Sequence, residues 1–297
     1  MATCYRHPSR ETAVSCSNCG RPICPDCMTT TPVGMRCPEC AKQRTKVTRM
    51  RDMSAGPQLT YTLIVINVIA FLAEGGRVFT FGGGEGGTLI RKGAVLGSSD
   101  NPLLAGEGVA HGQLWRLVTG GFLHENLLHI GFNMYILYIL GMQLEPVLGR
   151  LRFGVIYAVS LLTGSLGALI VSPHAVTIGA SGAVFGIMGA FAVELRARRM
   201  PLMRGGFGGI GGLILINLIF SFTFPGVSWG GHLGGLIGGA LAALLLQLGE
   251  RRRLRALALA GCAVIAAAAI AGSIVTSKSS EVGPLSQAPA TIFSPEP

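Results

Sequence analysis

Long blocks of apolar residues dominate the chain from residue 59 onward, in place of the alternating or one-sided patterns of soluble domains. Seven blocks are long enough, together with their flanks, to cross about 30 Å of hydrocarbon as helices. They cover residues 59–73, 127–144, 153–171, 178–193, 210–224, 229–248 and 254–275. The pattern predicts an all-α polytopic membrane protein with seven spans.

The segments outside these blocks are polar or rich in glycine. Residues 41–58 are basic and predict a linker that ends at a membrane surface. Residues 75–116 form a connection too long for a simple turn, and such loops are usually functional or disordered. Residues 277–297 are rich in Ser, Pro and Ala, which predicts a disordered tail.

Composition and charge support this membrane assignment. Only 13% of the 297 residues are charged, against roughly a quarter in soluble domains, which counts against a soluble enzyme. Near the span ends, fifteen basic residues lie on the side of the N-terminus and five on the opposite side. This asymmetry predicts a cytoplasmic N-terminus and an external C-terminus. Because the net charge of +10 follows loop parity, no nucleic-acid partner is expected.

The first 40 residues contain seven of the eight cysteines. Four pairs share a two-residue gap: Cys4 with His7, Cys16 with Cys19, Cys24 with Cys27, and Cys37 with Cys40. Such a gap lets both side chains reach one tetrahedral zinc ion, so four pairs supply two sites. Because Cys19 and Cys24 are close in sequence, we favour cross-bracing. One zinc would then be held by Cys4, His7, Cys24 and Cys27, and the other by Cys16, Cys19, Cys37 and Cys40.

A disulfide framework is the alternative for this head, but a cytoplasmic location is reducing and a histidine replaces one cysteine. The head resembles the B-box and related cross-braced zinc fingers over about 40 residues. The resemblance implies a cytoplasmic protein partner. Since all eight ligands are used, both zinc ions would be structural and needed for folding, and no cofactor is expected for catalysis.

Three polar constellations lie inside the apolar blocks. His129 and Asn133 share a helix face at the start of the second span, Ser181 opens the fourth among small residues, and His232 lies in the sixth. Gly235 and Gly239 follow His232 on nearly the same stripe, which predicts a groove for a second helix. With the N-terminus inside, these even-numbered spans all begin on the outer side. His129, Ser181 and His232 would therefore meet at one depth, where polar groups are functional by default.

Simpler or different interpretations exist for each constellation. A serine in a membrane helix is more often an interhelical hydrogen-bond donor than a nucleophile, and a lone histidine is often a packing residue. His124 and Glu125 suggest the zinc-protease motif HExxH, but the second histidine comes five residues after the first. Ala183 breaks the GxSxG nucleophile elbow, which excludes an α/β-hydrolase.

Taken together, these motifs resemble the rhomboid family of intramembrane serine proteases over residues 59–248. The resemblance is carried by Trp115-Arg116, His124 with His129-x3-Asn133, Gly179-x-Ser181-Gly182 and His232-x2-Gly235-x3-Gly239. It implies that Ser181 is the nucleophile and His232 its general base. It also implies an oxyanion site formed by the side chains of His129 and Asn133 with the Ser181 backbone N–H. Trp115 and Arg116 would be structural.

The predicted organisation is a zinc-binding head at 1–40, a linker at 41–58, a rhomboid-like six-helix core at 59–248, a seventh helix at 249–276 and a tail at 277–297. The expected function is cleavage of single-span or polytopic membrane proteins within or beside a transmembrane helix, near the outer face of a bacterial plasma membrane. Residues 221–231 would form a flexible cap over the site. The alternatives are a transporter or channel and an inactive, substrate-binding relative.

Overall fold

The computed structural model describes residues 2–32, 34–42, 56–75, 87–99, 101–203 and 209–281. The chain divides into two compact units, Met1–Ala55 and Gly56–Pro297. Most of the expected linker and residues 282–297 of the expected tail lie outside the described residues.

The first unit is a small fold with little regular structure. It contains β1 (Ala2–Thr3), β2 (Glu11–Thr12), η1 (Pro25–Cys27), β3 (Thr29–Thr31), β4 (Gly34–Arg36) and α1 (Pro38–Lys42). The antiparallel pairs β1–β2 and β3–β4 form two separate two-stranded sheets. Its buried apolar core consists of Ile23 and six cysteines. So small a core supplies little hydrophobic stabilisation by itself.

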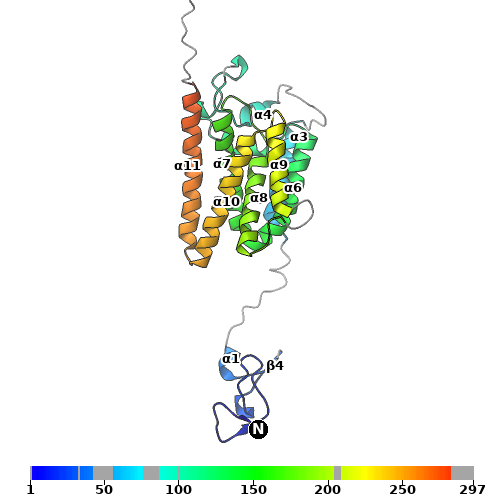
Figure 1. Cartoon of the computed structure of the whole chain (residues 1–297), viewed down its shortest axis with the longest axis vertical. Coiled ribbons are helices and arrows are strands. Elements are labelled where there is room, and N and C mark those ends of the chain that lie inside the picture. Colours follow the sequence, from blue (N-terminus) through cyan, green and yellow to red (C-terminus); the bar gives the residue numbers. More distant parts are fainter. Residues whose placement is uncertain are drawn as a thin grey trace, which may run out of the picture. The chain divides into compact units, whose positions relative to one another are not determined.

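The second unit is helical, and Figure 1 shows its long helices running side by side. They are α3 (Gln58–Ala73), α6 (Leu127–Leu148), α7 (Arg150–Val171), α8 (Ser181–Ala197), α9 (Gly209–Thr223), α10 (Trp229–Arg251) and α11 (Arg255–Glu281). Shorter elements between α3 and α6 are α4 (Thr88–Gly93), η2 (Pro102–Leu104), η3 (Val109–His111), α5 (Arg116–Thr119) and η4 (Gly120–Phe122).

Each of the seven apolar blocks in the sequence is occupied by one of these long helices. Among the described residues, α6, α7, α10 and α11 are long and apolar enough to cross a membrane, and α3 and α9 are shorter apolar helices. A polytopic all-α fold is therefore confirmed, while the count of seven spans stays a prediction. The helix α8 begins at Ser181, three residues later than expected, because Gly179 has a φ of 120° that no helix permits.

The packing places α10 between α7 and α8, with α11 against α7 and α10, and α3 against α6. In Figure 1, α11 accordingly lies at one edge of the bundle. Buried apolar side chains fill the interior, among them Leu137, Phe153, Ile156 and Ile187. Large apolar side chains such as Phe132, Leu215 and Phe222 remain exposed, as expected for helices that face lipid.

The segment between α3 and α6 is organised around Arg116, whose side chain is fully buried. Its guanidinium donates to the carbonyl oxygens of Arg91 and Ala94 at 2.9 and 3.0 Å, to Gln113 Oε1 at 2.6 Å and to the Glu107 carboxylate. The preceding Trp115 is half exposed and donates to the Lys92 carbonyl at 3.2 Å. Arg116 therefore stabilises this segment from within and is not a free surface charge.

Helix α11 extends to Glu281, five residues past the expected boundary between the seventh helix and the tail. Contacts with the segment before α5 explain the difference. Ser277 is fully buried, Ser280 Oγ lies 3.2 Å from Ser98 Oγ, and the Glu281 carboxylate lies 3.0 Å from His111 Nε2. These tertiary contacts outweigh the weak helix propensity of a serine-rich stretch.

The N-terminus of α3 is capped by a carboxylate from another helix. Glu145 of α6 is 2% exposed and accepts hydrogen bonds from the backbone N–H of Leu59 at 2.9 Å and from that of Thr60 at 2.7 Å. The Thr60 hydroxyl also donates to it at 2.7 Å. The first helical N–H groups have no partner within their own helix, and a negative charge there is favoured by the helix dipole.

Replacing Glu145 by glutamine is expected to destabilise the helical unit by about 1–3 kcal/mol, because an amide supplies one acceptor oxygen without charge for three donors. Unfolding of the full chain in detergent micelles measures this difference. The matched control is Gln143→Ala on the same helix, since Gln143 is exposed and bonds only to its own helix at Ile139 among the described residues. Equal stability of the two variants would contradict the capping role.

Candidate active site and metal clusters

Ser181 and His232 form a direct hydrogen bond between α8 and α10. The distance from Ser181 Oγ to His232 Nε2 is 2.8 Å. Ser181 is the first residue of α8, and His232 lies in the first turn of α10, where Ser228 caps the helix by accepting from the Gly231 N–H. The structure thus places a hydroxyl and an imidazole at a distance that permits proton transfer.

The imidazole of His232 is held on two further sides. The ring of Phe185, one turn into α8, stacks on it with a centroid distance of 4.2 Å and an interplanar angle of 16°. On the far edge, Ser221 Oγ of α9 lies 2.6 Å from His232 Nδ1. Sequence reasoning missed both contacts and assigned Ser221 to a flexible cap, whereas it is a helical residue that is 2% exposed.

The turn before Ser181 is fixed by the segment that precedes α6. Thr177 pairs with Val95 through two backbone hydrogen bonds of 2.9 Å, and the Gly179 N–H donates to the Gly120 carbonyl at 2.9 Å. A side chain at Gly179 would lie 2.6 Å from His129 Nε2. Glycine is thus required at residue 179 both for the positive φ and for the close approach of His129.

The expected oxyanion residues lie on α6 beside this turn. The imidazole of His129 approaches Gly179 as described. Its ring lies edge-on to that of His124, with 5.0 Å between the ring centroids. The Asn133 amide donates to the His129 carbonyl of its own helix at 2.9 Å. His124 Nε2 accepts from the Ala180 N–H at 3.4 Å. The structure therefore brings His129 to the site, while Asn133 bonds to its own helix in this state.

Glycines determine how closely α8 and α10 approach each other. A side-chain Cβ at Gly235 would lie 2.0 Å from the Gly182 carbonyl oxygen, and one at Gly239 would lie 2.3 Å from the Gly186 carbonyl oxygen. The predicted groove beside His232 is thus filled by α8. A second row, Gly230, Gly234 and Gly238, faces α7 in the same way. Glycine allows α10 to contact two helices at backbone distance.

Replacing Gly235 by valine is expected to reduce activity at least about tenfold and to lower stability, because side-chain atoms would force α10 away from α8 and lengthen the bond between Ser181 and His232. Substrate cleavage and thermal unfolding of the detergent-solubilised chain measure both effects. Gly131→Ala is the control, since its Cβ has nothing within 4 Å. Normal activity in Gly235→Val would show that the close approach is not required.

A small cavity lies beside the two residues. Its volume is about 30 Å³, and its lining includes Thr177, Gly179, Ser181 and His232. This is enough for about one water molecule. The serine therefore faces a space that is large enough for a water molecule.

Comparison with known proteins finds a family whose match includes the residues of this site. The Rhomboid domain family matches residues 111–248. The protein named "Putative rhomboid protease YdcA" from Bacillus subtilis (strain 168) is 35% identical over 147 residues, which are 49% of this chain and 74% of that protein. The chain belongs to the rhomboid family. It is an integral membrane protein, as the family and the apolar helices together show.

Other rhomboid relatives are similar over part of their length. Rhomboid protease GluP of Bacillus subtilis (strain 168) is 34% identical over 192 residues, which are 65% of this chain and 35% of GluP. RHOMBOID-like protein 7 of Arabidopsis thaliana is 34% identical over 137 residues, 46% of this chain and 44% of that protein. The chain thus spans about a third to a half of these two relatives. Of these relatives, GluP is named as a rhomboid protease and YdcA as a putative one.

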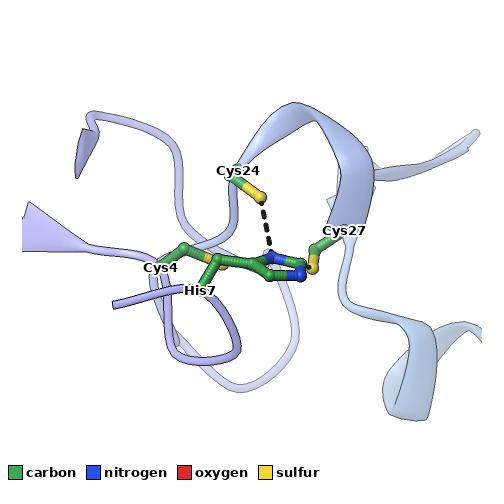
Figure 2. Close-up of side chains that lie close together, drawn as sticks. All are labelled: Cys4, His7, Cys24 and Cys27. Atoms are coloured by element: carbon green, nitrogen blue, oxygen red, sulfur yellow. Dashed lines mark hydrogen bonds between the residues drawn. The ribbon is translucent and has the colours of Figure 1, made fainter. Parts of the chain in front are cut away.

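The cysteine-rich unit contains two clusters with the expected membership. Cys4, His7, Cys24 and Cys27 form one, and Cys16, Cys19, Cys37 and Cys40 form the other, with the ligand atoms of each cluster within 4.8 Å of one another. Figure 2 shows the first cluster, in which the imidazole of His7 points at the sulfur atoms. The side chains are grouped as cross-bracing requires, and the family match does not extend to this unit.

The distances within the clusters fit a tetrahedral zinc ion. His7 Nδ1 lies 3.3, 3.4 and 3.9 Å from the sulfur atoms of Cys24, Cys27 and Cys4. Cys19 Sγ lies 3.8 Å from Cys37 Sγ. Ligands at about 2.0–2.3 Å from one tetrahedral centre are separated by roughly 3.3–3.8 Å. The residues present therefore fit the metal.

Backbone N–H groups surround the sulfur atoms, as is usual around metal-bound thiolates. The Cys37 N–H donates to Cys16 Sγ at 3.3 Å and lowers the pKa of that thiol to about 6. Burial raises the pKa of Cys4, but the N–H groups of Arg6, Cys24 and His7 outweigh it and lower the pKa to about 6. Burial and the neighbouring Cys4 and Cys24 thiols raise the pKa of Cys27 to about 11. In each cluster, backbone N–H groups thus favour the thiolate form of one cysteine, Cys4 or Cys16.

Proposed function

We propose that the protein is an intramembrane serine endopeptidase in which Ser181 attacks the peptide bond and His232 is the general base. The observation that carries this proposal is the 2.8 Å hydrogen bond between Ser181 Oγ and His232 Nε2 inside a rhomboid fold. A serine hydroxyl is a weak nucleophile until a base removes its proton. An imidazole at this distance supplies that base.

The reaction proceeds by two acyl transfers. Ser181 Oγ forms a bond to the carbonyl carbon, its proton passes to His232 Nε2, and the carbonyl oxygen becomes an oxyanion. Collapse of this intermediate breaks the C–N bond, and the leaving amine takes the proton from Nε2. A water molecule then attacks the acyl-enzyme with the same base and releases the second product and free Ser181.

The oxyanion needs hydrogen-bond donors that are in place before it forms, each worth about 3–4 kcal/mol. The Ser181 N–H is at the N-terminus of α8, where the helix dipole also favours negative charge. The imidazole of His129 is close by, at Gly179. We propose these two as donors, with Asn133 as the third after its amide leaves the His129 carbonyl.

Substrates would be single-span or polytopic membrane proteins, cut within or beside a transmembrane helix near the outer face. This orientation rests on the basic residues near the span ends, which favour a cytoplasmic N-terminus and an external C-terminus in a bacterial plasma membrane. The two clusters of the head would hold two structural zinc ions in a B-box-like module, with Cys4, His7, Cys24 and Cys27 around one and Cys16, Cys19, Cys37 and Cys40 around the other. That module would offer a surface to a cytoplasmic protein partner.

The test is reconstitution of the full chain in lipid vesicles with a single-span reporter protein. Mass spectrometry of the products should locate one cut within or beside the reporter span, near the vesicle face that corresponds to the starts of α6, α8 and α10. An intact reporter, together with substrate binding that Ser181→Ala leaves unchanged, would instead favour the inactive relative. Ion flux without cleavage would favour the transporter or channel.

A further inference from the structure

His232 is in contact with a second serine on the side away from Ser181. The Ser221 hydroxyl of α9 lies 2.6 Å from His232 Nδ1, and the same hydroxyl donates to the Asn217 carbonyl at 2.6 Å. Both side chains are buried, Ser221 at 2% and His232 at 8% exposure. The described residues provide no acidic partner for His232, so Ser221 occupies the place that a carboxylate takes in a three-residue serine protease site.

The bond from Ser221 to the Asn217 carbonyl favours one protonation of the imidazole. A hydroxyl has one proton, and Ser221 gives it to the Asn217 carbonyl, which can only accept. Ser221 Oγ is then an acceptor toward His232, and Nδ1 must carry the imidazole proton. In the neutral ring, Nε2 is consequently the unprotonated nitrogen, and it faces Ser181 as an acceptor. This is the tautomer that a general base requires.

We propose that Ser221 is a positioning residue that selects this tautomer and orients His232 toward Ser181, in a relay from the Asn217 carbonyl through Ser221 and His232 to Ser181. The inference rests on the proposed function for its catalytic meaning, but the tautomer itself does not. When Nε2 receives the Ser181 proton, Nδ1 still donates to Ser221, so the ring does not rotate during the reaction. The ring of Phe185 stacks on one face and restricts tilting in the same way.

The structure provides a matched control on the same helix. Thr223 Oγ1 donates to the Ile219 carbonyl at 2.7 Å, four residues back, just as Ser221 bonds to Asn217. Thr223 is exposed, and among the described residues its hydroxyl bonds to the Ile219 carbonyl and to no imidazole. Thr223→Val therefore removes a hydroxyl of equal local geometry without touching His232.

Kinetics of the reconstituted full chain provide the first readout. Ser221→Ala is expected to lower kcat roughly tenfold with KM unchanged, because alanine leaves both tautomers in competition but removes no substrate contact. Ser221→Thr, which keeps the hydroxyl, should recover most of the loss, and Thr223→Val should match the wild type. A kcat for Ser221→Ala within twofold of wild type, or an equal loss in Thr223→Val, would overturn the proposal.

Nitrogen NMR of the full chain with 15N-labelled histidine gives a readout that does not depend on proteolysis. The His232 signals are identified by their absence in His232→Asn. Above the titration range, wild type should show a protonated Nδ1 and an unprotonated Nε2 at His232, and Ser221→Ala should show both forms. The opposite tautomer in wild type would refute the relay even if cleavage is normal. Absent cleavage with the expected tautomer would refute only the proposed function.

Discussion

Ser181→Ala and His232→Ala are each expected to reduce peptide cleavage on the order of 10³- to 10⁶-fold, which corresponds to about 4–8 kcal/mol of transition-state stabilisation. The reason is that, in the proposed mechanism, both residues take part in the same proton transfer across the 2.8 Å bond. The residual rate would come from binding and from the oxyanion donors alone. The measurement is the initial rate of cleavage of a single-span reporter in lipid vesicles.

The double variant sharpens this test. Since neither residue functions without the other, Ser181→Ala with His232→Ala should lose no more than about tenfold beyond either single variant. A serine-directed phosphonate reagent should label Ser181 in the wild type and fail to label the protein with His232→Ala. Multiplicative losses in the double variant would mean that the two residues act independently, against the mechanism.

A buried serine elsewhere in the bundle is the control for a merely structural effect. Ser273 of α11 is fully buried and donates to the Ala269 carbonyl of its own helix at 2.8 Å. Ser273→Ala removes a similar hydroxyl far along the chain from the motifs and should leave cleavage unchanged. If Ser181→Ala cleaved the reporter as fast as Ser273→Ala, Ser181 would be an ordinary interhelical serine and not a nucleophile.

Local spacing carried much of the site information in the sequence. The motif around Gly179 and Ser181 marks a turn that only glycine can make, and the row from His232 to Gly239 marks a face that only small residues can provide. The two-residue gaps identified the ligand pairs, since two side chains at this spacing can both reach one metal ion. These features depend on residues within a few positions of one another, which is why pattern alone could predict them.

Contacts between distant helices were not predictable in the same way. Ser221 and His232 are eleven residues apart on different helices, and nothing in the intervening sequence shows that their side chains meet. The pairing of Arg116 with Glu107 and the capping of α3 by Glu145 likewise depend on how the segments pack. Hydropathy identifies which segments are apolar, but it does not identify which polar atoms the packing brings together.

Removal of the proposed zinc ions is expected to unfold the cysteine-rich unit, because its core is seven residues and a structural zinc site contributes about 10–16 kcal/mol of folding free energy at neutral pH. Elemental analysis of the purified full chain should give two zinc ions per chain. A chelator should then make residues 2–42 sensitive to protease. Acidification should also release the metal, since thiolate and neutral imidazole ligands bind protons as the pH falls. A zinc content of zero in the native protein would contradict zinc binding at both clusters.

Paired substitutions distinguish cross-bracing from sequential pairing, in which ligand pairs that follow one another in the chain share one zinc ion. Cys4 and Cys24 belong to the same cluster in the structure, whereas Cys16 belongs to the other. Cys4→Ser with Cys24→Ser should therefore retain about one zinc, while Cys4→Ser with Cys16→Ser should lose both. Sequential pairing predicts the reverse, because Cys4 and Cys16 would then share an ion. Cys262→Ser is the control, because it changes a buried cysteine of α11 that lies in neither cluster. It should keep two zinc ions, which would show that zinc loss is specific to the cluster cysteines.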